Sequence, residues 1–223
     1  MRPSAAGGTI PAMPTPATGV LEPIRLRRAY RAFDPSPLEP AIEAALWGSV
    51  SLAPSAGNSQ PARLVVAKSA EARAATIAAL SEGNRGWAGV APLLVAVVAN
   101  PSHDMVIPNR DGTTREMWLL HVGIAVGNLL VQSTAMNLTA HPMAGFDELA
   151  VREALGIPDD VRVVTVIAIG RPGVVENLSP DLQKRETVPQ TRLPIDHLVG
   201  HDRWDTRQAL SYKAYREQLE PKS

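Results

Sequence analysis

The residues best suited to chemistry lie in a turn-rich loop at positions 52–61, with the sequence LAPSAGNSQP. Hydroxyl and carboxamide groups lie between Pro54 and Pro61, while Gly57 and Asn58 tolerate left-handed backbone. Such a loop can hydrogen-bond a planar heteroaromatic ring whose edge alternates N–H and C=O groups. A plain helix-to-strand turn with solvated polar side chains is the alternative that this stretch alone leaves equally open.

A cluster of arginines precedes this loop, at positions 25, 27, 28 and 31. Arg27, Arg28 and Arg31 would share one face of a helix or of a helix-to-loop segment. Guanidinium groups suit phosphate oxygens, which accept paired N–H donors. Taken alone, three arginines are more typical of a solvated basic helix face. They indicate a phosphate site only when considered together with the polar loop at 52–61.

Composition narrows the class of protein. The 22 basic and 22 acidic residues balance, which argues against nucleic acid as the main partner. The chain has no cysteine, so it has no disulfide or thiolate site, and it fits a reducing cytoplasm. There is no dinucleotide fingerprint, P-loop, nucleophile elbow or paired carboxylate, and His197 with His201 makes a poor metal site. We therefore expect no catalytic side chain and no metal, with a cofactor carrying the chemistry.

Hydrophobic periodicity and capping residues predict alternating helices and strands. Helices are expected from Pro37 to about Val50 behind a Ser36 cap, from Ser69 to about Leu80, and from a Thr113–Glu116 capping box to about Leu138. Two more are expected, one after Asp147 to near Leu155 and one over 203–219. Strands are expected at 63–68 (buried), 92–98 and 161–169, with loops or turns at 82–88, 99–114, 141–146 and 189–199. The pattern predicts an α/β or α+β fold with a three-layer core.

The stretch from Met117 to Phe146 contains no charged residue. A membrane span is rejected because polar side chains interrupt the run and no flanking charge asymmetry supports it. A helix that is apolar nearly all round belongs in a core or between subunits, and Gly123 with Gly127 would allow close approach of another helix. Residues 1–23, rich in proline and alanine, are expected to form a flexible arm and not a signal peptide.

Several segments together resemble the nitroreductase family of flavin mononucleotide (FMN) enzymes. They occur in the family's order, which makes the joint match specific, and they lie between about residues 24 and 205. In sequence they read RRAYRAFDP at 27–35, APSAGNSQP at 53–61, GN, GWA and AP within 83–92, the helix from Gly123 ending in MAGFD at 143–147, IGRP at 169–172 and TRLP at 191–194.

The resemblance implies an α+β three-layer sandwich, with a central, mainly antiparallel sheet flanked by helices, and an intertwined homodimer with FMN at the interface. The FMN-binding domain would cover 24–205, followed by a helical extension at 206–223. Arginines would hold the phosphate and flavin pole, Asn84 the flavin or its ribityl chain, and the 143–145 backbone the ring edge, with loop 53–61 coming from the other subunit. The implied cofactor contacts are Arg27, Arg28, Ala29, Arg31, Pro54, Ser55, Ala56, Asn58, Gln60, Asn84, Met143, Ala144, Gly145 and Arg192.

The function implied is a cytoplasmic FMN-dependent oxidoreductase in which NAD(P)H reduces a small electron-poor acceptor, such as a nitroaromatic or quinone, by ping-pong chemistry. Two alternatives stay open. The same scaffold could serve another flavin reaction, such as azoline dehydrogenation, reductive dehalogenation or flavin fragmentation. The protein could also be a non-enzymatic flavin-binding dimer.

Three positions depart from the family pattern. Ala29 stands where the family often has serine, so one hydroxyl contact to the cofactor is expected to be missing. Ala62 replaces a frequent tryptophan, which should loosen the packing under the loop. His121 replaces a frequent aspartate, and we expect it to be a satisfied core histidine.

Overall fold

The computed structural model describes residues 19–219, which form two units that divide between Gln183 and Lys184. Most of the predicted N-terminal arm, residues 1–18, lies outside the described residues. The first described helix, α1 (Glu22–Leu26), begins at the end of that predicted arm. Each unit is described below by itself.

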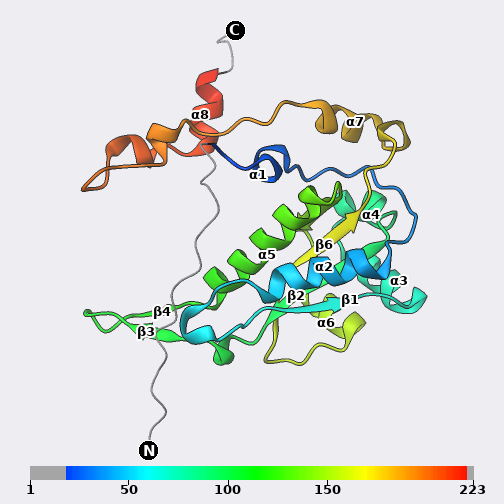
Figure 1. The fold of residues 1–223 in the computed structure, drawn as a ribbon, viewed down its shortest axis with the longest axis horizontal. Helices are drawn as coiled ribbons and strands as arrows, with labels where there is room; N and C mark the ends of the chain where they lie inside the picture. Colours follow the sequence, from blue (N-terminus) through cyan, green and yellow to red (C-terminus); the bar gives the residue numbers. More distant parts are fainter. Residues whose placement is uncertain (1–18, 220–223) are drawn as a thin grey trace, which may run out of the picture. The chain divides into compact units, whose positions relative to one another are not determined.

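A four-stranded antiparallel sheet forms the centre of the first unit (Figure 1). Its strands follow the order β1 (Arg63–Val66), β2 (Leu93–Ala99), β6 (Arg162–Gly170) and β5 (Thr139–Met143). The central pair is β2 and β6, in which Leu94 lies opposite Ala168 and Val95 lies opposite Ile167. Every residue of β2 is buried, so both faces of the sheet must be covered.

Helices cover both faces of this sheet. One face packs against α2 (Pro40–Ser51) and α5 (Trp118–Ala135), and its core includes Val95, Ile167, Leu46, Val122 and Leu129. The other face packs against α3 (Ala70–Ala79), α4 (Glu82–Ala88) and α6 (Glu148–Leu155), and its core includes Leu94, Ala168, Leu80, Trp87 and Val151. Alternate strand residues therefore fill two separate cores, which is the predicted three-layer α+β arrangement.

The remaining elements of the described residues are short. They comprise a hairpin of β3 (Val106–Pro108) and β4 (Thr114–Glu116), helix α7 (Pro180–Thr187), helix α8 (Tyr212–Leu219), and the 3₁₀ turns η1 (Ala56–Asn58), η2 (Pro101–His103), η3 (Val175–Asn177), η4 (Ile195–His197) and η5 (Thr206–Ala209).

Two predicted helix caps are confirmed. The Ser69 side chain accepts a hydrogen bond from the Ala72 amide, and α3 follows directly. The Asp147 side chain accepts from the Ala150 amide, and α6 ends at Gly156 with a φ of 63°, the left-handed conformation that glycine adopts readily. At these two helices the residue that begins the helix is therefore fixed by its local capping hydrogen bond.

Two predicted helix starts are wrong. Both were predicted from a serine or threonine cap with a glutamate three residues later. The Ser36 amide donates to Asp34 Oδ1 at 2.7 Å, which makes a local turn, so α2 begins later at Pro40 after Glu39. The predicted Thr113–Glu116 capping box fails because Thr114–Glu116 forms β4, and α5 begins only at Trp118. The predicted helix end near Leu138 is also late, since α5 stops at Ala135.

Three further segments differ from their predicted class. Residues 82–88 form α4 despite two glycines, because burial of Trp87 (1% exposed) stabilises the helix. Residues within the predicted turn at 141–146 instead complete β5, since pairing with β6 extends the strand to Met143. Strand β1 is correctly placed but only half-buried, because it lies at the sheet edge and pairs with β2 alone.

By length and composition alone, α5 could span a membrane. In the fold, its buried face packs on the sheet through Val122 and Leu129, as the face of a core helix does. Its opposite face includes Leu119 and Leu120, each 55% exposed. The helix is thus apolar on the side that the first unit leaves uncovered as well as on the side that it buries.

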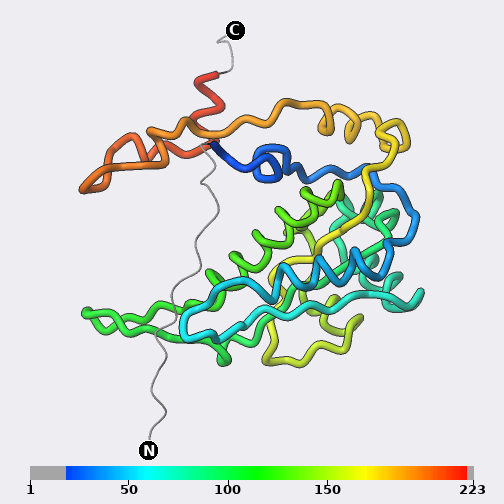
Figure 2. Tube along the Cα trace, viewed as in Figure 1, coloured from blue at the N-terminus to red at the C-terminus, as the bar shows by residue number. Residues whose placement is uncertain are grey.

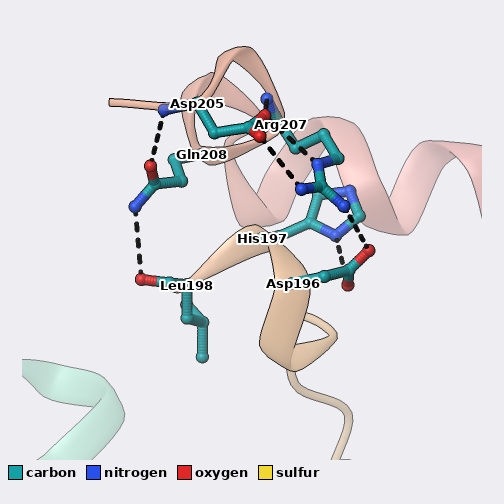
Figure 3. Close-up of polar contacts among 6 residues, drawn as sticks. All are labelled: Asp196, His197, Leu198, Asp205, Arg207 and Gln208. Carbon is teal, nitrogen blue, oxygen red and sulfur yellow. Dashed lines mark hydrogen bonds and ion pairs between the residues drawn. The ribbon is translucent and has the colours of Figure 1, made fainter. Parts of the chain in front are cut away.

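The second unit contains a compact polar network (Figure 3). Arg207 contacts both carboxylate oxygens of Asp205 (Nε to Oδ1 3.1 Å, Nη2 to Oδ2 2.9 Å), and its backbone amide donates to Oδ1 at 2.8 Å. Gln208 accepts from the Asp205 amide at 2.8 Å, which completes a capping box on η5. The predicted single helix over 203–219 is therefore two pieces, η5 and α8.

These donors set the charge of Asp205. Hydrogen bonds from the side chain and the backbone of Arg207 lower the pKa of Asp205 from 3.8 to about 2. Because the folded pKa is depressed, this contact stabilises the unit fully above pH 3.8, and the contribution is lost as the pH falls towards 2.

We predict that Arg207→Ala raises the pKa of Asp205 to a value between 2 and 3.8, since the backbone amide of residue 207 still donates. Carboxyl NMR titration of Asp205 in the full chain measures this shift. Arg203→Ala removes the same charge from an exposed position and is the matched control. An unchanged Asp205 titration in Arg207→Ala would show that the side-chain contact does not exist in solution.

Candidate cofactor site

The arginine segment follows α1 as extended chain and is fixed at its far end by β6. The Asp34 amide donates to the Arg171 carbonyl at 3.0 Å, and the Gly173 amide donates to the Ala32 carbonyl at 2.9 Å. A side chain at Gly173 would overlap the backbone of Phe33, so only glycine allows this approach. Arg27, Arg28 and Arg31 thus lie on a helix-to-loop segment, one of the two predicted settings.

The buried Trp87 of α4 supports this segment. The guanidinium carbon of Arg31 lies 5.9 Å from the centre of the Trp87 ring, and the His141 ring lies 4.5 Å from it. His141 Nδ1 is 3.0 Å from the Tyr30 carbonyl, and because a carbonyl only accepts, Nδ1 carries the proton. The indole and imidazole rings therefore fix both the side chain of Arg31 and the backbone beside it.

Asn84, also on α4, meets the end of β5. Its Nδ2 donates to the Gly145 carbonyl at 3.0 Å, and the Ser81 amide donates to the same oxygen at 2.9 Å. Gly145 lies so close that an added Cβ would overlap the Ser81 hydroxyl. The amides of Ala144 and Gly145 donate to no other residue in the described part of the chain, and Ala144 is exposed. These two amides can therefore donate to a bound ligand.

The polar loop at 53–61 lies beside the N-terminal part of α5 (Figure 2). Gly57 and Asn58 adopt φ values of 59° and 57°, as the sequence suggests, and Gln60 also has a positive φ of 46°. The Ala56 amide donates to His121 Nε2 at 3.1 Å, and the Gln60 amide donates to the Ser55 hydroxyl at 2.9 Å. The loop therefore has one defined shape, held partly by α5 and partly by its own side chains.

A buried pair that the sequence did not reveal lies behind the loop. His121 Nδ1 is 2.6 Å from Asp104 Oδ2, with the two side chains 5% and 1% exposed. Burial opposes ionisation of Asp104, but donors from Met105, Ser59 and His121 outweigh burial and hold the pKa of this carboxyl below its usual value. His121 is thus a satisfied core histidine, as predicted, whereas Asp104 was hidden in the polar connection at 99–114.

A cavity of about 240 Å³ adjoins the inner side of the loop. Trp47, Ala62 and His121 are among the residues that line it. The small side chain of Ala62 leaves this space, in line with the looser packing predicted where the family often has tryptophan.

The predicted cofactor residues fall into separate groups. Arg31 lies over Trp87 of α4, Asn84 of the same helix bonds to Gly145, and Met143 is buried in the core (2% exposed). Pro54, Ser55 and Gln60 line the loop cavity, to which none of the first group contributes. Arg27 lines a second cavity with Gly127 and Asn128 of α5. Arg192 lies in the second unit, where it donates to the Thr191 carbonyl at 2.8 Å.

Comparison with known proteins identifies the class. The sequence model described as the nitroreductase family matches residues 24–171, so the chain belongs to the nitroreductase family. It is 30% identical over 201 residues to an NADH dehydrogenase of Thermus thermophilus, with 78% of this chain and 91% of the relative covered. It is 29% identical over 179 residues to a putative NADH dehydrogenase/NAD(P)H nitroreductase of Streptomyces coelicolor, with 74% and 88% covered.

A solved structure agrees with this family. A crystal structure described as an oxidoreductase containing FMN is 30% identical and superposes with a TM-score of 0.73, covering 85% of this chain and 96% of the other. A nitroreductase family protein of Clostridium novyi NT superposes with a TM-score of 0.60 at 23% identity, over 71% of this chain and 87% of the other, and shares the fold.

The contact between Asn84 and Gly145 gives a direct test of the site's geometry. Gly145→Ala would place a methyl group against the Ser81 hydroxyl and Asn84 Nδ2. We expect it to lower the free energy of unfolding by about 1–3 kcal/mol, measured by denaturant unfolding.

Gly86→Ala is the matched control, because a Cβ at Gly86 meets nothing within 4 Å and the residue lies in α4. This control should be neutral or stabilising by up to about 1 kcal/mol through helix propensity. Equal stability of the two variants would contradict the close approach at Gly145.

Proposed function

We propose that this protein is a cytoplasmic FMN-dependent oxidoreductase that uses NAD(P)H to reduce small electron-poor acceptors, such as nitroaromatics and quinones. Membership of the nitroreductase family supports this function. The names of two relatives, NADH dehydrogenase and NAD(P)H nitroreductase, and the FMN in the description of a similar structure point to the same chemistry.

The residues of the first unit fit FMN. The observation that carries this fit is the pair of Ala144 and Gly145 amides, which directly follow β5 and donate to no described residue. A flavin edge presents the acceptors that such amides need. Within the same group, Arg31 supplies positive charge suited to a phosphate and Asn84 supplies a carboxamide.

We assign the cofactor contacts as follows. Arginines 27, 28 and 31 would hold the phosphate and flavin pole, with Ala29 beside them lacking the hydroxyl that the family often has. Asn84 and the backbone at 143–145 would hold the ring edge and the ribityl chain. Loop 53–61, with Pro54, Ser55, Ala56, Asn58 and Gln60, would cover the ring of the partner subunit.

A homodimer accounts for the separation of these groups. In one chain the loop lines a cavity to which Arg31, Asn84 and Gly145 do not contribute, and in the proposed dimer the loop of a second copy would lie beside them. The exposed face of α5 offers the contact surface. It carries Leu119, Leu120 and Gly123, all exposed, and a Cβ at Gly123 would meet nothing within 4 Å.

The chain's own residues bind and orient, and they leave electron transfer to the cofactor. FMN, held by these residues, would supply the hydride and electron transfer between reduced nicotinamide and an acceptor. The arginines neutralise the phosphate, the amides at 144–145 orient the ring edge, and the loop excludes water. Because the nicotinamide and the acceptor would use the same cleft in turn, the kinetics should be ping-pong.

One prediction of this function concerns the visible absorption spectrum. Purified full-length protein, supplied with FMN where needed, should show a flavin spectrum that bleaches on anaerobic addition of NADH or NADPH and returns on addition of a quinone. Bound flavin that neither nucleotide reduces would instead indicate a flavin-binding protein or another reductant. A protein that takes up no FMN would refute the proposed function.

Another prediction concerns the contribution of the arginines to FMN affinity. Arg31→Ala and Arg27→Ala should each weaken FMN binding by about ten- to a hundredfold, the loss expected when a charge-assisted hydrogen bond to phosphate is removed. Equilibrium dialysis or flavin fluorescence measures the dissociation constant.

Arg25→Ala is the matched control, because Arg25 belongs to the same cluster but is exposed and pairs with Glu22 at 3.4 Å. It should leave FMN binding within about twofold, as expected for an exposed ion pair. Equal FMN affinity in all three variants would show that Arg27 and Arg31 do not bind the phosphate.

A further inference from the structure

We propose that Asp104 and His121 are positioning residues that set the shape of loop 53–61. His121 accepts the hydrogen bond of the Ala56 amide, so this amide cannot donate to the cofactor. The proposal rests on the proposed function insofar as the loop faces a flavin. Its structural part stands on the hydrogen bonds of this chain alone.

The hydrogen bonds fix the tautomer of His121. The Ala56 amide can only donate, so His121 Nε2, at 3.1 Å, must present its lone pair. The proton of the neutral ring then lies on Nδ1, which donates to Asp104 Oδ2 at 2.6 Å. A directional chain of donors therefore runs from the loop backbone through the imidazole to a buried carboxylate.

Asp104 holds the loop at a second point. Its Oδ1 accepts from the Ser59 hydroxyl at 2.8 Å and from the Met105 amide at 2.6 Å. The attachment points Ala56 and Ser59 thus lie on either side of Gly57 and Asn58, two of the three loop residues with a positive φ. A turn with a positive φ at a residue other than glycine persists only where its surroundings hold it, and this pair provides that support.

The same carboxylate connects two loops that flank the candidate site. Asp104 precedes the hairpin of β3 and β4, and the Met117 amide donates to the Met105 carbonyl at 3.1 Å just before α5 begins. The Met105 sulfur is the atom that a Cβ at Gly57 would meet, at 3.8 Å. The cofactor-facing loop and the polar connection at 99–114 are therefore held as one assembly.

A purely structural role explains this arrangement less well. Burying a carboxylate and an imidazole costs desolvation energy, and two apolar side chains of similar size would fill the space without that cost. What the polar pair adds is a specific acceptor for one backbone amide of the loop. The consequence is that Ala56, one of the predicted cofactor contacts, would contact the flavin through its side chain or carbonyl and not through its amide.

The first test reads the tautomer and the amide directly, without activity. In full-length protein labelled with ¹⁵N-histidine, His121 should show a protonated Nδ1 and an unprotonated Nε2. The Ala56 amide should be protected from hydrogen exchange. A wild-type His121 protonated at Nε2, or an unprotected Ala56 amide, would overturn the proposal whether or not the protein binds FMN.

The Asp104→Asn variant sharpens this test. Asparagine has one acceptor oxygen, which the Met105 amide and Ser59 hydroxyl use, so its NH₂ group faces His121 Nδ1. His121 must then carry its proton on Nε2, opposite the Ala56 amide. We expect the tautomer to reverse and exchange of the Ala56 amide to become at least tenfold faster, whereas Asp111→Asn, in the exposed turn between β3 and β4, should change neither.

FMN titration separates this proposal from the proposed function. If wild type binds FMN, Asp104→Asn should weaken binding about tenfold relative to Asp111→Asn. An Asp104→Asn variant that frees the Ala56 amide yet binds FMN as tightly as wild type would overturn the positioning role and leave the proposed function intact. A wild type that binds no FMN would refute the proposed function, while the tautomer still decides the structural claim.

Discussion

The antiparallel pairing of β2 with β6 is the constraint on which the rest of the first unit depends. All seven residues of β2 and most of β6 are buried, so neither face of this pair tolerates water. Two helical layers are therefore required, and the alternation of side chains along the strands divides the apolar residues into two cores. Part of the candidate site lies just beyond β5 and β6, where these two strands leave the apolar core.

Each part of the candidate site is fixed to such an end. Phe33 bridges to Pro172 just beyond β6, which sets the arginine segment, and Asn84 bonds to Gly145 just beyond β5. Trp87 joins these two anchors, since it is buried in one core and contacts Arg31 and His141. The site is thus held by backbone pairing, a hydrogen bond and a buried ring where the phosphate and the ring edge are proposed to bind, which suits a protein that orients a cofactor.

The sequence predicted the elements whose signals are local and missed those that depend on distant partners. Ser69 and Asp147 cap their helices as expected, because capping involves the next three residues only. Residues 141–143 of β5 were predicted as part of a turn at 141–146, and only their pairing with β6 makes them part of a strand. Asp104 could not be paired with His121 from sequence, since 17 residues separate them and the intervening segment gave no periodic signal.

The two apolar cores do not explain every feature of helix α5. Its buried face fills one core, which accounts for Val122 and Leu129 but not for the absence of charge over residues 117–146. On the open face, Leu119 and Leu120 are exposed, and Gly123 and Gly127 have free space where a Cβ would lie. Glycine in a helix interior lowers stability, and exposed leucines gain nothing from water. Both features would become favourable if a second copy packed on this face, which is therefore the surface that the proposed homodimer would use.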